Sequence, residues 1–261
     1  MRSSSHDVYD LIARVYDQPE HLDVTEAFFR ATAPLVKARP RGTAVLDVAC
    51  GTGVLADRLA RRRVPVVGVD DSRAMLAIAR RRCRRHGARV RLQQDDLLRF
   101  RAPRRCAVAL ACGDVFNHFL ARGPLVRALR CIRRNLTPGG VLAFDATTRH
   151  FYERYWDERD YLLEGDGGDL AMCCSWDPAR QVASARMIAY AKTGSGRSGG
   201  WTKAETTLRE KLHGDAFLRG VLAEAGFRRV ERRPWSPWPD VARKERALWT
   251  ARVPDGAHAR P

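Results

Sequence analysis

Asp47 lies in a short apolar run that ends in two glycines, Val45-Leu46-Asp47-Val48-Ala49-Cys50-Gly51-Thr52-Gly53. A run of this length predicts a buried parallel strand, followed by a tight turn and the start of a helix. Glycines in such a turn let a ligand approach the backbone where any Cβ would clash. The free N–H groups of the helix start suit an anionic group, whereas the Asp47 carboxylate suits a ligand with an ammonium group nearby.

Two more acidic positions follow the next apolar runs. Asp70 ends Val66-Val67-Gly68-Val69-Asp70, and Asp95-Asp96 comes after the run at 90–93. A carboxylate at a strand end can accept both hydroxyl groups of a ribose, and the Asp95–Asp96 pair is placed to contact a base. Together with Asp47, these positions predict a nucleoside ligand across the carboxyl ends of three strands.

The glycine pattern admits two kinds of nucleoside. Residues 51–56 satisfy the loose pattern GxGxxA, which favours a nicotinamide cofactor. Asp47 argues against it, because a carboxylate beside the turn repels a pyrophosphate. S-adenosylmethionine has an ammonium group, a ribose, an adenine and no phosphate, so the carboxylates favour this ligand.

Helix and strand signals alternate in the first part of the chain, which is typical of a doubly wound α/β sheet. Asp71 and Ser72 can cap a helix over 73–86, which Gly87 ends. A turn is expected at 137–140. The other predicted helices are 7–17, 22–38, 54–62 and 123–135, and the predicted strands are 44–49, 64–69, 90–93, 106–112 and 141–145.

The pattern changes after Thr148, where helical periodicity is lost over 160–212. Strands are expected at 169–176, 182–191 and 202–213, with a Gly/Ser-rich loop at 192–200. A helix over 215–225 and strands at 228–233 and 247–253 follow. We therefore expect an N-terminal helical cap (1–40), a cofactor-binding core (41–150), an antiparallel substrate-covering insertion (151–213), a segment that completes the core sheet (214–253) and a flexible tail (254–261).

The motif at 47–53, with Asp70, Asp95 and the turn Pro138-Gly139-Gly140, resembles the class I S-adenosylmethionine-dependent methyltransferases over roughly residues 40–150. Further pairs and runs are similar to the small-molecule branch of that family, which includes N,N-dimethyltransferases of amino sugars and related natural-product enzymes: Tyr9-Asp10, Tyr16-Asp17, Asp114-Val115-Phe116-Asn117-His118 and Ala225-Gly226-Phe227. The resemblance implies a Rossmann-like, doubly wound seven-stranded sheet with an antiparallel β excursion after strand five.

The resemblance also implies which residues contact the cofactor. Asp47 and the turn at 49–53 would hold the methionine moiety, Asp70 the ribose, and Asp71, Ser72 and Met75 the adenine. The expected set is Tyr9, Tyr16, Asp47, Ala49, Cys50, Gly51, Gly53, Asp70, Asp71, Ser72, Met75, Asp95, Asp96, Leu97, Cys112, Asp114 and Asn117. Two positions depart from the family pattern, because Asp71 replaces a common apolar residue and Gln94 a common glycine.

Three histidines are candidate general bases for methyl transfer: His118, His150 and His213. His118 lies in an apolar run, so a packed histidine is the alternative. His150 follows the predicted strand at 141–145, and His213 precedes a glycine after the insertion. A base is needed if the acceptor is a hydroxyl group, whereas an amine needs only its free-base form.

Composition limits the class of protein. The 261 residues carry 47 Lys and Arg against 30 Asp and Glu, for a net charge of +17. Such an excess is found in nucleic-acid binders, but only five of the 47 are Lys, which favours a GC-rich genome as the cause. Seven cysteines without a CxxC pair predict buried free thiols and no metal site. With no apolar run of the roughly 18–20 residues that a membrane helix needs, and no apolar signal region over 1–10, a cytoplasmic protein is expected.

These observations predict a methyltransferase that uses S-adenosylmethionine to methylate N or O of a small polar metabolite, such as an amino sugar or a natural-product intermediate. Three alternatives stay open: an RNA-directed methyltransferase, a nicotinamide-dependent oxidoreductase and a non-catalytic binder. No base-flipping motif follows the strand at 106–112, which disfavours nucleic acid as a partner. A small-molecule acceptor is the expected partner, no membrane is involved, and a homodimer is one candidate assembly.

Overall fold

The computed structural model describes residues 9–10, 12–165, 168–193, 200–238 and 245–255. The helices are η1 (Ala13–Val15), α2 (Pro19–Ala38), α3 (Val54–Arg61), α4 (Arg73–Cys83), η2 (Arg84–Arg89), η3 (Val115–His118), α5 (Arg122–Arg134), α6 (Arg149–Tyr155) and α7 (Asp215–Glu224). The strands are β1 (Ala44–Val48), β2 (Val66–Asp70), β3 (Val90–Gln94), β4 (Cys106–Ala111), β5 (Leu136–Thr147), β6 (Arg159–Gly165), β7 (Gly168–Asp177), β8 (Val182–Thr193), β9 (Gly200–Lys211), β10 (Arg228–Trp235) and β11 (Arg246–Arg252).

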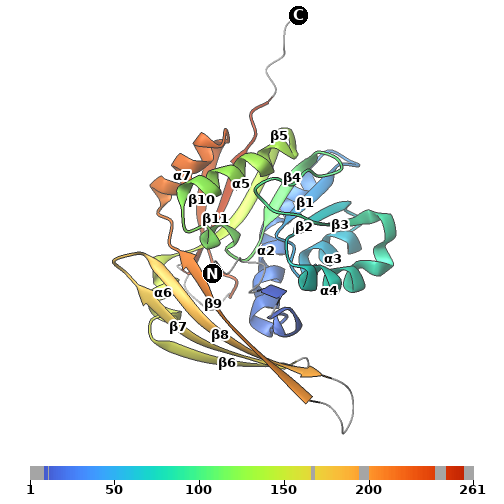
Figure 1. The fold of residues 1–261 in the computed structure, drawn as a ribbon. Coiled ribbons are helices and arrows are strands. Elements are labelled where there is room, and N and C mark those ends of the chain that lie inside the picture. Colours follow the sequence, from blue (N-terminus) through green and yellow to red (C-terminus); the bar gives the residue numbers. More distant parts are fainter. Residues whose placement is uncertain (1–8, 11, 166–167, 194–199, 239–244, 256–261) are drawn as a thin grey trace, which may run out of the picture.

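The strands form two sheets (Figure 1). The larger has seven strands in the order β10-β11-β5-β4-β1-β2-β3, and the smaller has four in the order β6-β7-β8-β9. Strands β1 to β5 pair in parallel, whereas β11 is antiparallel to β5 and to β10. The predicted α/β class, with an antiparallel excursion after the fifth strand, is confirmed.

Alternate side chains of the central strands bury against helices on both faces of the large sheet. In β1, Leu46 and Val48 pack with residues of α5 and α7, whereas Val45 packs with residues of α2 and α3. A strand covered on both faces must be apolar at nearly every position, as Ala44–Val48 is. Asp47 is the exception in that run, and at 2% exposure it is as buried as its neighbours.

The small sheet packs through its own apolar cluster against η1 and α6. Val15, Tyr152, Trp176 and Met187 belong to this cluster, so the N-terminal turn lies between the small sheet and the large one. Strands β7, β8 and β9 pair antiparallel over long stretches and pass below the large sheet in Figure 1. This arrangement brings the insertion to the segment that follows β4.

Two local predictions were wrong, and two elements were missed. The turn predicted at 137–140 lies within β5, because β4 and β5 continue to pair across an irregularity between Cys106 and Val108. The helix predicted over 73–86 ends at Cys83 and continues as η2. α6 and β6 were not predicted, since β6 depends on pairing with β7 and lacks a clear pattern of its own. The predicted loop and tail lie largely outside the described residues, at 194–199 and 256–261.

The cysteine prediction was partly wrong. All seven are free thiols and five are buried, but Cys112 is half-buried and Cys173 is exposed. None of the helices described combines the length and the apolar composition that a membrane crossing requires.

Candidate active site

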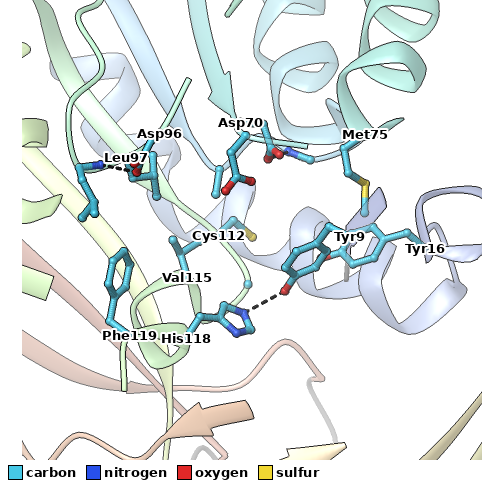
Figure 2. A pocket seen from close by; sticks show the side chains of 15 residues that line it. Tyr9, Tyr16, Asp70, Met75, Asp96, Leu97, Cys112, Val115, His118 and Phe119 are labelled. Carbon is cyan, nitrogen blue, oxygen red and sulfur yellow. Dashed lines mark hydrogen bonds between the residues drawn. The ribbon is translucent and has the colours of Figure 1, made fainter. Parts of the chain in front are cut away.

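A cavity of about 560 Å³ opens where β1, β2 and β4 end (Figure 2). Two smaller chambers adjoin it, so we call it the main cavity. Many of the residues expected to bind a cofactor line it, although they come from distant parts of the chain. Its lining is Tyr9, Tyr16, Ala49, Gly51, Asp70, Asp71, Met75, Asp96, Leu97, Leu98, Cys112, Gly113, Val115, His118 and Phe119.

The two glycines of the turn after β1 serve different purposes. Gly51 has φ +53°, and a Cβ built on it meets no atom within 4 Å, so it would point into open space beside the main cavity. Gly53 has φ +77°, and its Cβ would lie 2.9 Å from the Cβ of Ala79 in α4. Gly51 therefore keeps room for a ligand, whereas Gly53 allows two helices to approach.

Asp70 ties the end of β2 to the glycine turn. Its carboxylate accepts hydrogen bonds from the backbone N–H groups of Gly51, at 2.8 Å, and Ser72, at 2.9 Å. Burial raises the pKa of Asp70 to about 6, although these two hydrogen bonds oppose the shift. Figure 2 shows the carboxylate at the edge of the main cavity, where it can accept hydroxyl groups of a ligand.

Asp47 faces a small side chamber of about 50 Å³ that adjoins the main cavity at Tyr16, Ala49 and Cys112. Its Oδ2 is buried and has no hydrogen-bond partner among the described residues. Burial, with a smaller contribution from the charge of Asp70, raises the pKa of Asp47 to about 8. A buried carboxylate oxygen without a partner is costly, and a cationic ligand group in this chamber would offset that cost.

The N-terminal segment closes one side of the main cavity. The Tyr9 hydroxyl lies 3.0 Å from Nε2 of His118, as Figure 2 shows. Asp10 accepts hydrogen bonds from the hydroxyl of Ser72 and the N–H of Ala74, at the start of α4. These contacts join residues more than 60 positions apart. They attach the start of the N-terminal segment to the other side of the cavity by hydrogen bonds.

The charges around the main cavity indicate what kind of nucleoside fits. In the part of the chain that the structure describes, its lining includes Asp70, Asp71 and Asp96 but neither Arg nor Lys. An acidic lining repels the pyrophosphate of a dinucleotide and suits a cationic nucleoside without phosphate. With the space above Gly51 and the unpartnered Asp47 oxygen, the residues present fit S-adenosylmethionine.

A second chamber of about 200 Å³ adjoins the main cavity at Tyr9, Tyr16, Cys112, Gly113 and His118. We call it the acceptor chamber. Its lining combines apolar residues, mainly from α2, α6 and the small sheet, with charged groups. The apolar residues are Ile12, Val24, Phe151, Trp156, Met172, Met187, Leu208 and Trp238, and the charged residues are Glu20, Asp114, Glu210 and Arg246.

Arg246 pairs with two acidic residues near this chamber. Its guanidinium donates to Asp145 at 2.5 Å and lies 2.7 Å from the carboxylate of Asp114. Asp145 also accepts the N–H of Gly113 at 2.8 Å, which fixes the segment after β4. Glu210 is only 3% exposed and accepts a hydrogen bond from the hydroxyl of Tyr152 at 2.7 Å.

Only one of the three candidate bases lies at the cavities. His118 lines both. The side chain of His150 is 41% exposed and lies 3.8 Å from Glu245, away from either lining, because α6 turns it outward. His213 donates to the carbonyl of Phe119 and stacks on Phe217, and burial lowers its pKa to about 4. His213 is therefore a packed histidine, and we do not retain it or His150 as a base.

Several other expected residues support the site without lining the main cavity. Ser72 caps α4 by accepting the N–H of Met75. The carboxylate of Asp95 accepts the N–H of Asp96 and the side-chain amide of Gln93. Asn117 donates to the carbonyl of Lys211 and so joins η3 to β9. Cys50 lies at the side chamber, and Asp114 lies at the acceptor chamber.

Asp145, Glu210 and Arg246 were not predicted from the sequence. Asp145 could have been found from the sequence, because it is an acidic residue at the end of an otherwise apolar predicted strand at 141–145. Glu210 and Arg246 carried no such signal, since both sit in strands with other charged residues. Glu210 reaches the other two only because β9 packs against η3, in the segment that follows β4.

Comparison with known proteins identifies the family. Residues 45–140 match the family model described as a methyltransferase domain. The demethylmenaquinone methyltransferase of Deinococcus radiodurans is 32% identical over 174 residues, which is 61% of this chain and 68% of that protein. The chain belongs to the S-adenosylmethionine-dependent methyltransferases.

Other methyltransferases are similar over shorter or more divergent stretches. The dTDP-3-amino-3,6-dideoxy-alpha-D-glucopyranose N,N-dimethyltransferase of Streptomyces fradiae is 29% identical over 53% of this chain and 51% of its own length. The match thus spans about half the length of several curated methyltransferase relatives. The solved structure of the CcbJ methyltransferase from Streptomyces caelestis has the same fold, with a TM-score of 0.73, 22% identity and coverage of 96% and 100% of the two chains. Solved methyltransferases of this fold include some with S-adenosylmethionine bound, the cofactor of this family.

Proposed function

We propose that this methyltransferase transfers a methyl group from S-adenosylmethionine to a nitrogen atom of a small-molecule amine. The observation that carries the proposal is the acidic acceptor chamber, which adjoins the main cavity where a methyl donor fits. The N,N-dimethyltransferase of Streptomyces fradiae acts on an amino sugar by its name, which makes an amino group a natural candidate for the acceptor.

The charge balance of the acceptor chamber favours a cation. Asp145 and Glu210 are buried and Asp114 is half-buried, and these three carboxyl groups lie around one guanidinium, that of Arg246, which pairs with Asp114 and Asp145. At least one negative charge thus lacks a counter-ion when two of the three carboxyl groups are ionised. Buried charges are costly unless they are paired, so a cationic amine binds here more favourably than a neutral alcohol of the same shape.

The cofactor would be held by the residues around the main cavity. Gly51 leaves the space it needs, Asp70 can accept its ribose hydroxyls, and Asp47 can face its ammonium group. Met75 and Leu97 lie on two sides of the cavity, where an adenine can pack between them. When bound, S-adenosylmethionine supplies a methyl group on a sulfonium, which a nucleophile displaces in line.

The protein contributes orientation and exclusion of water. Tyr9 and Tyr16 line both chambers, and both side chains are half-buried. The apolar wall contributed by the small sheet can bury the body of an acceptor, which leaves its nitrogen at the junction beside His118. Because charge disperses in this kind of transition state, a dry and well-oriented chamber is more useful than a strong acid.

A screen with S-adenosylmethionine labelled in its methyl group tests the proposal. The purified protein would be incubated with pairs of small molecules that differ only in an amino or a hydroxyl group. We expect label to enter amines and not their hydroxyl partners. Transfer to oxygen alone would contradict the choice of nitrogen, and failure of adenosylhomocysteine to bind in calorimetry would contradict the cofactor site.

A further inference from the structure

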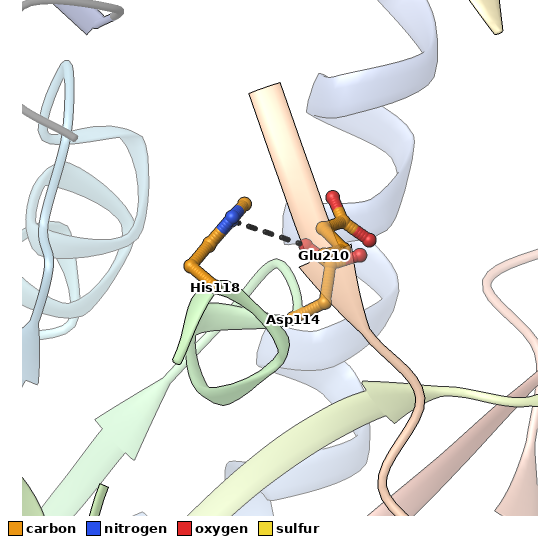
Figure 3. A group of neighbouring side chains, drawn as sticks. All are labelled: Asp114, His118 and Glu210. Carbon is orange, nitrogen blue, oxygen red and sulfur yellow. Dashed lines mark ion pairs between the residues drawn. The ribbon is translucent and has the colours of Figure 1, made fainter. Parts of the chain in front are cut away.

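Three side chains with ligand atoms converge at the acceptor chamber (Figure 3). Asp114 and His118 come from the segment after β4, and Glu210 comes from β9 in the small sheet. Their ligand atoms lie within 4.8 Å of one another. Nε2 of His118 and Oδ1 of Asp114 are 4.0 Å apart.

The spacing fits an ammonium group better than a metal ion. A nitrogen that donates in tetrahedral directions, at about 2.8 Å, holds its acceptors about 4.6 Å apart. A divalent metal at about 2.1 Å holds neighbouring ligands about 3.0–3.4 Å apart. Asp114 is paired through Oδ2 with the guanidinium of Arg246 at 2.7 Å, so that Oδ1 is the oxygen that lies near His118.

We propose that Glu210 anchors the acceptor as an ammonium ion and then takes its proton to free the nucleophile. This inference rests on the proposed function and adds a base that the sequence analysis did not identify. Asp114 and the Tyr9–His118 pair form the other sides of the ammonium site. The apolar residues that line the same chamber would contact an apolar body attached to the nitrogen.

The surroundings of Glu210 make it suitable for this role. The groups that face it are Tyr9, Asp114, His118, Asp145, Tyr152, Cys174 and Arg246. Burial, followed by the charge of Asp114, raises the pKa of Glu210. Its carboxyl group therefore holds a proton near neutral pH when the chamber contains no cation, and an arriving ammonium ion drives that proton off to solvent.

The proton transfer is balanced. An N–H bond of the bound ammonium breaks, its electron pair stays on nitrogen, and an O–H bond forms on the Glu210 carboxylate. The nitrogen then carries the lone pair that methyl transfer requires. Burial lowers the pKa of His118, so its imidazole is neutral and adds no positive charge that would oppose the ammonium.

Calorimetry with cyclohexylamine and cyclohexanol tests this inference, because the two probes share a shape and differ in charge. Each would be titrated into the protein saturated with adenosylhomocysteine, in two buffers of different ionisation enthalpy, which counts the protons released. We expect the wild type to bind cyclohexylamine roughly 10- to 100-fold more tightly than cyclohexanol, with release of up to one proton. The Glu210→Gln variant should lose most of this preference for cyclohexylamine, and it should release no proton on binding.

The control is Glu205→Gln, since Glu205 lies on the same strand but pairs with Arg186 at the surface. It should behave as the wild type. Equal affinity of the wild type for the two probes would overturn the inference without any variant, and so would unchanged proton release in Glu210→Gln. Tight binding of Mn²⁺, seen by electron paramagnetic resonance and required for amine binding, would instead make the cluster a metal site. Binding of adenosylhomocysteine to the same samples reports separately on the proposed function.

Discussion

At the scale of single residues, the site depends on two glycines whose surroundings restrict what a Cβ could contact. Gly51 and Gly53 are both left-handed and two positions apart, yet only Gly51 borders the main cavity. A side chain on Gly51 would occupy ligand space, whereas one on Gly53 would strike α4. The glycine turn therefore combines a binding role and a packing role.

We predict that Gly51→Ala and Gly53→Ala separate these two roles. Both variants carry the strain of a left-handed alanine, about 1–2 kcal/mol. Gly53→Ala should lower the melting temperature more, because its methyl group meets Ala79. Gly51→Ala should instead reduce the affinity for adenosylhomocysteine by more than Gly53→Ala does. Thermal melts and calorimetry check both effects, and equal losses in the two variants would contradict the distinction.

At the scale of elements, the N-terminal segment is attached to the core by polar contacts at both of its ends. Asp10 binds the start of α4, and Asp17 accepts a hydrogen bond from the hydroxyl of Thr52 at 2.6 Å. Arg82 joins the second contact, because it lies 2.6 Å from Asp17 and donates to the carbonyl of Thr52. The segment that carries Tyr9 and Tyr16 is thus fixed across the main cavity.

Replacement of Asp17 should loosen that attachment. Asp17→Asn removes the charge that pairs with Arg82, so we expect adenosylhomocysteine to dissociate several-fold faster, on the order of 1 kcal/mol in barrier height. Stopped-flow fluorescence of the tryptophans measures the rate. Asp23→Asn is a matched control, since Asp23 is exposed on α2. If both variants release the ligand at the wild-type rate, the segment does not retain the cofactor.

At the scale of the whole molecule, the ligand chambers hold buried carboxyl groups whose ionised form is unfavourable. Burial raises the pKa of Asp47 to about 8 and that of Asp70 to about 6, and it raises the pKa of Glu210 as well. The protein is strongly basic, with a net charge of +17, yet the charged residues that line the two chambers are mainly acidic. Steering of a cationic ligand thus relies on the local chambers and not on the overall charge.

The raised pKa of Asp47 predicts that the stability of the protein depends on pH. The folded protein keeps the Asp47 proton up to about pH 8, whereas the unfolded chain loses it near pH 4. The folded state therefore binds more protons in this window, and its stability falls as pH rises from about 4 to about 8. Relative to that of Asp47→Asn, the free energy of unfolding of the wild type should fall by roughly 2–5 kcal/mol between about pH 4 and about pH 8.

Urea unfolding at several pH values measures the difference. Above about pH 8 it should level off, since Asp47 is then ionised in both states. Asp23→Asn should show no comparable trend. A difference between wild type and Asp47→Asn that stays constant from pH 4 to pH 8 would mean that the Asp47 carboxyl titrates as if it were exposed.

The sequence by itself determined the order of the core elements and the cofactor side of the site. The run around Asp47, the acid at 70 and the alternation of helices and strands are local patterns, and their periods dictate which residues enter the core. Local patterns predicted Gly51, Asp70 and Asp96 at one cavity, because the carboxyl ends of neighbouring parallel strands meet at one edge, and the family resemblance added Met75.

Only the tertiary structure decided the acceptor side. Glu210 and Arg246 reach the acceptor chamber because β9 and β11 pack near the segment after β4, and sequence spacing carries no trace of contacts 94 to 132 residues apart. The same packing turned His150 outward and buried His213 against Phe217. Long-range packing chooses which polar residues become buried and which face a ligand, and local periodicity cannot encode that choice.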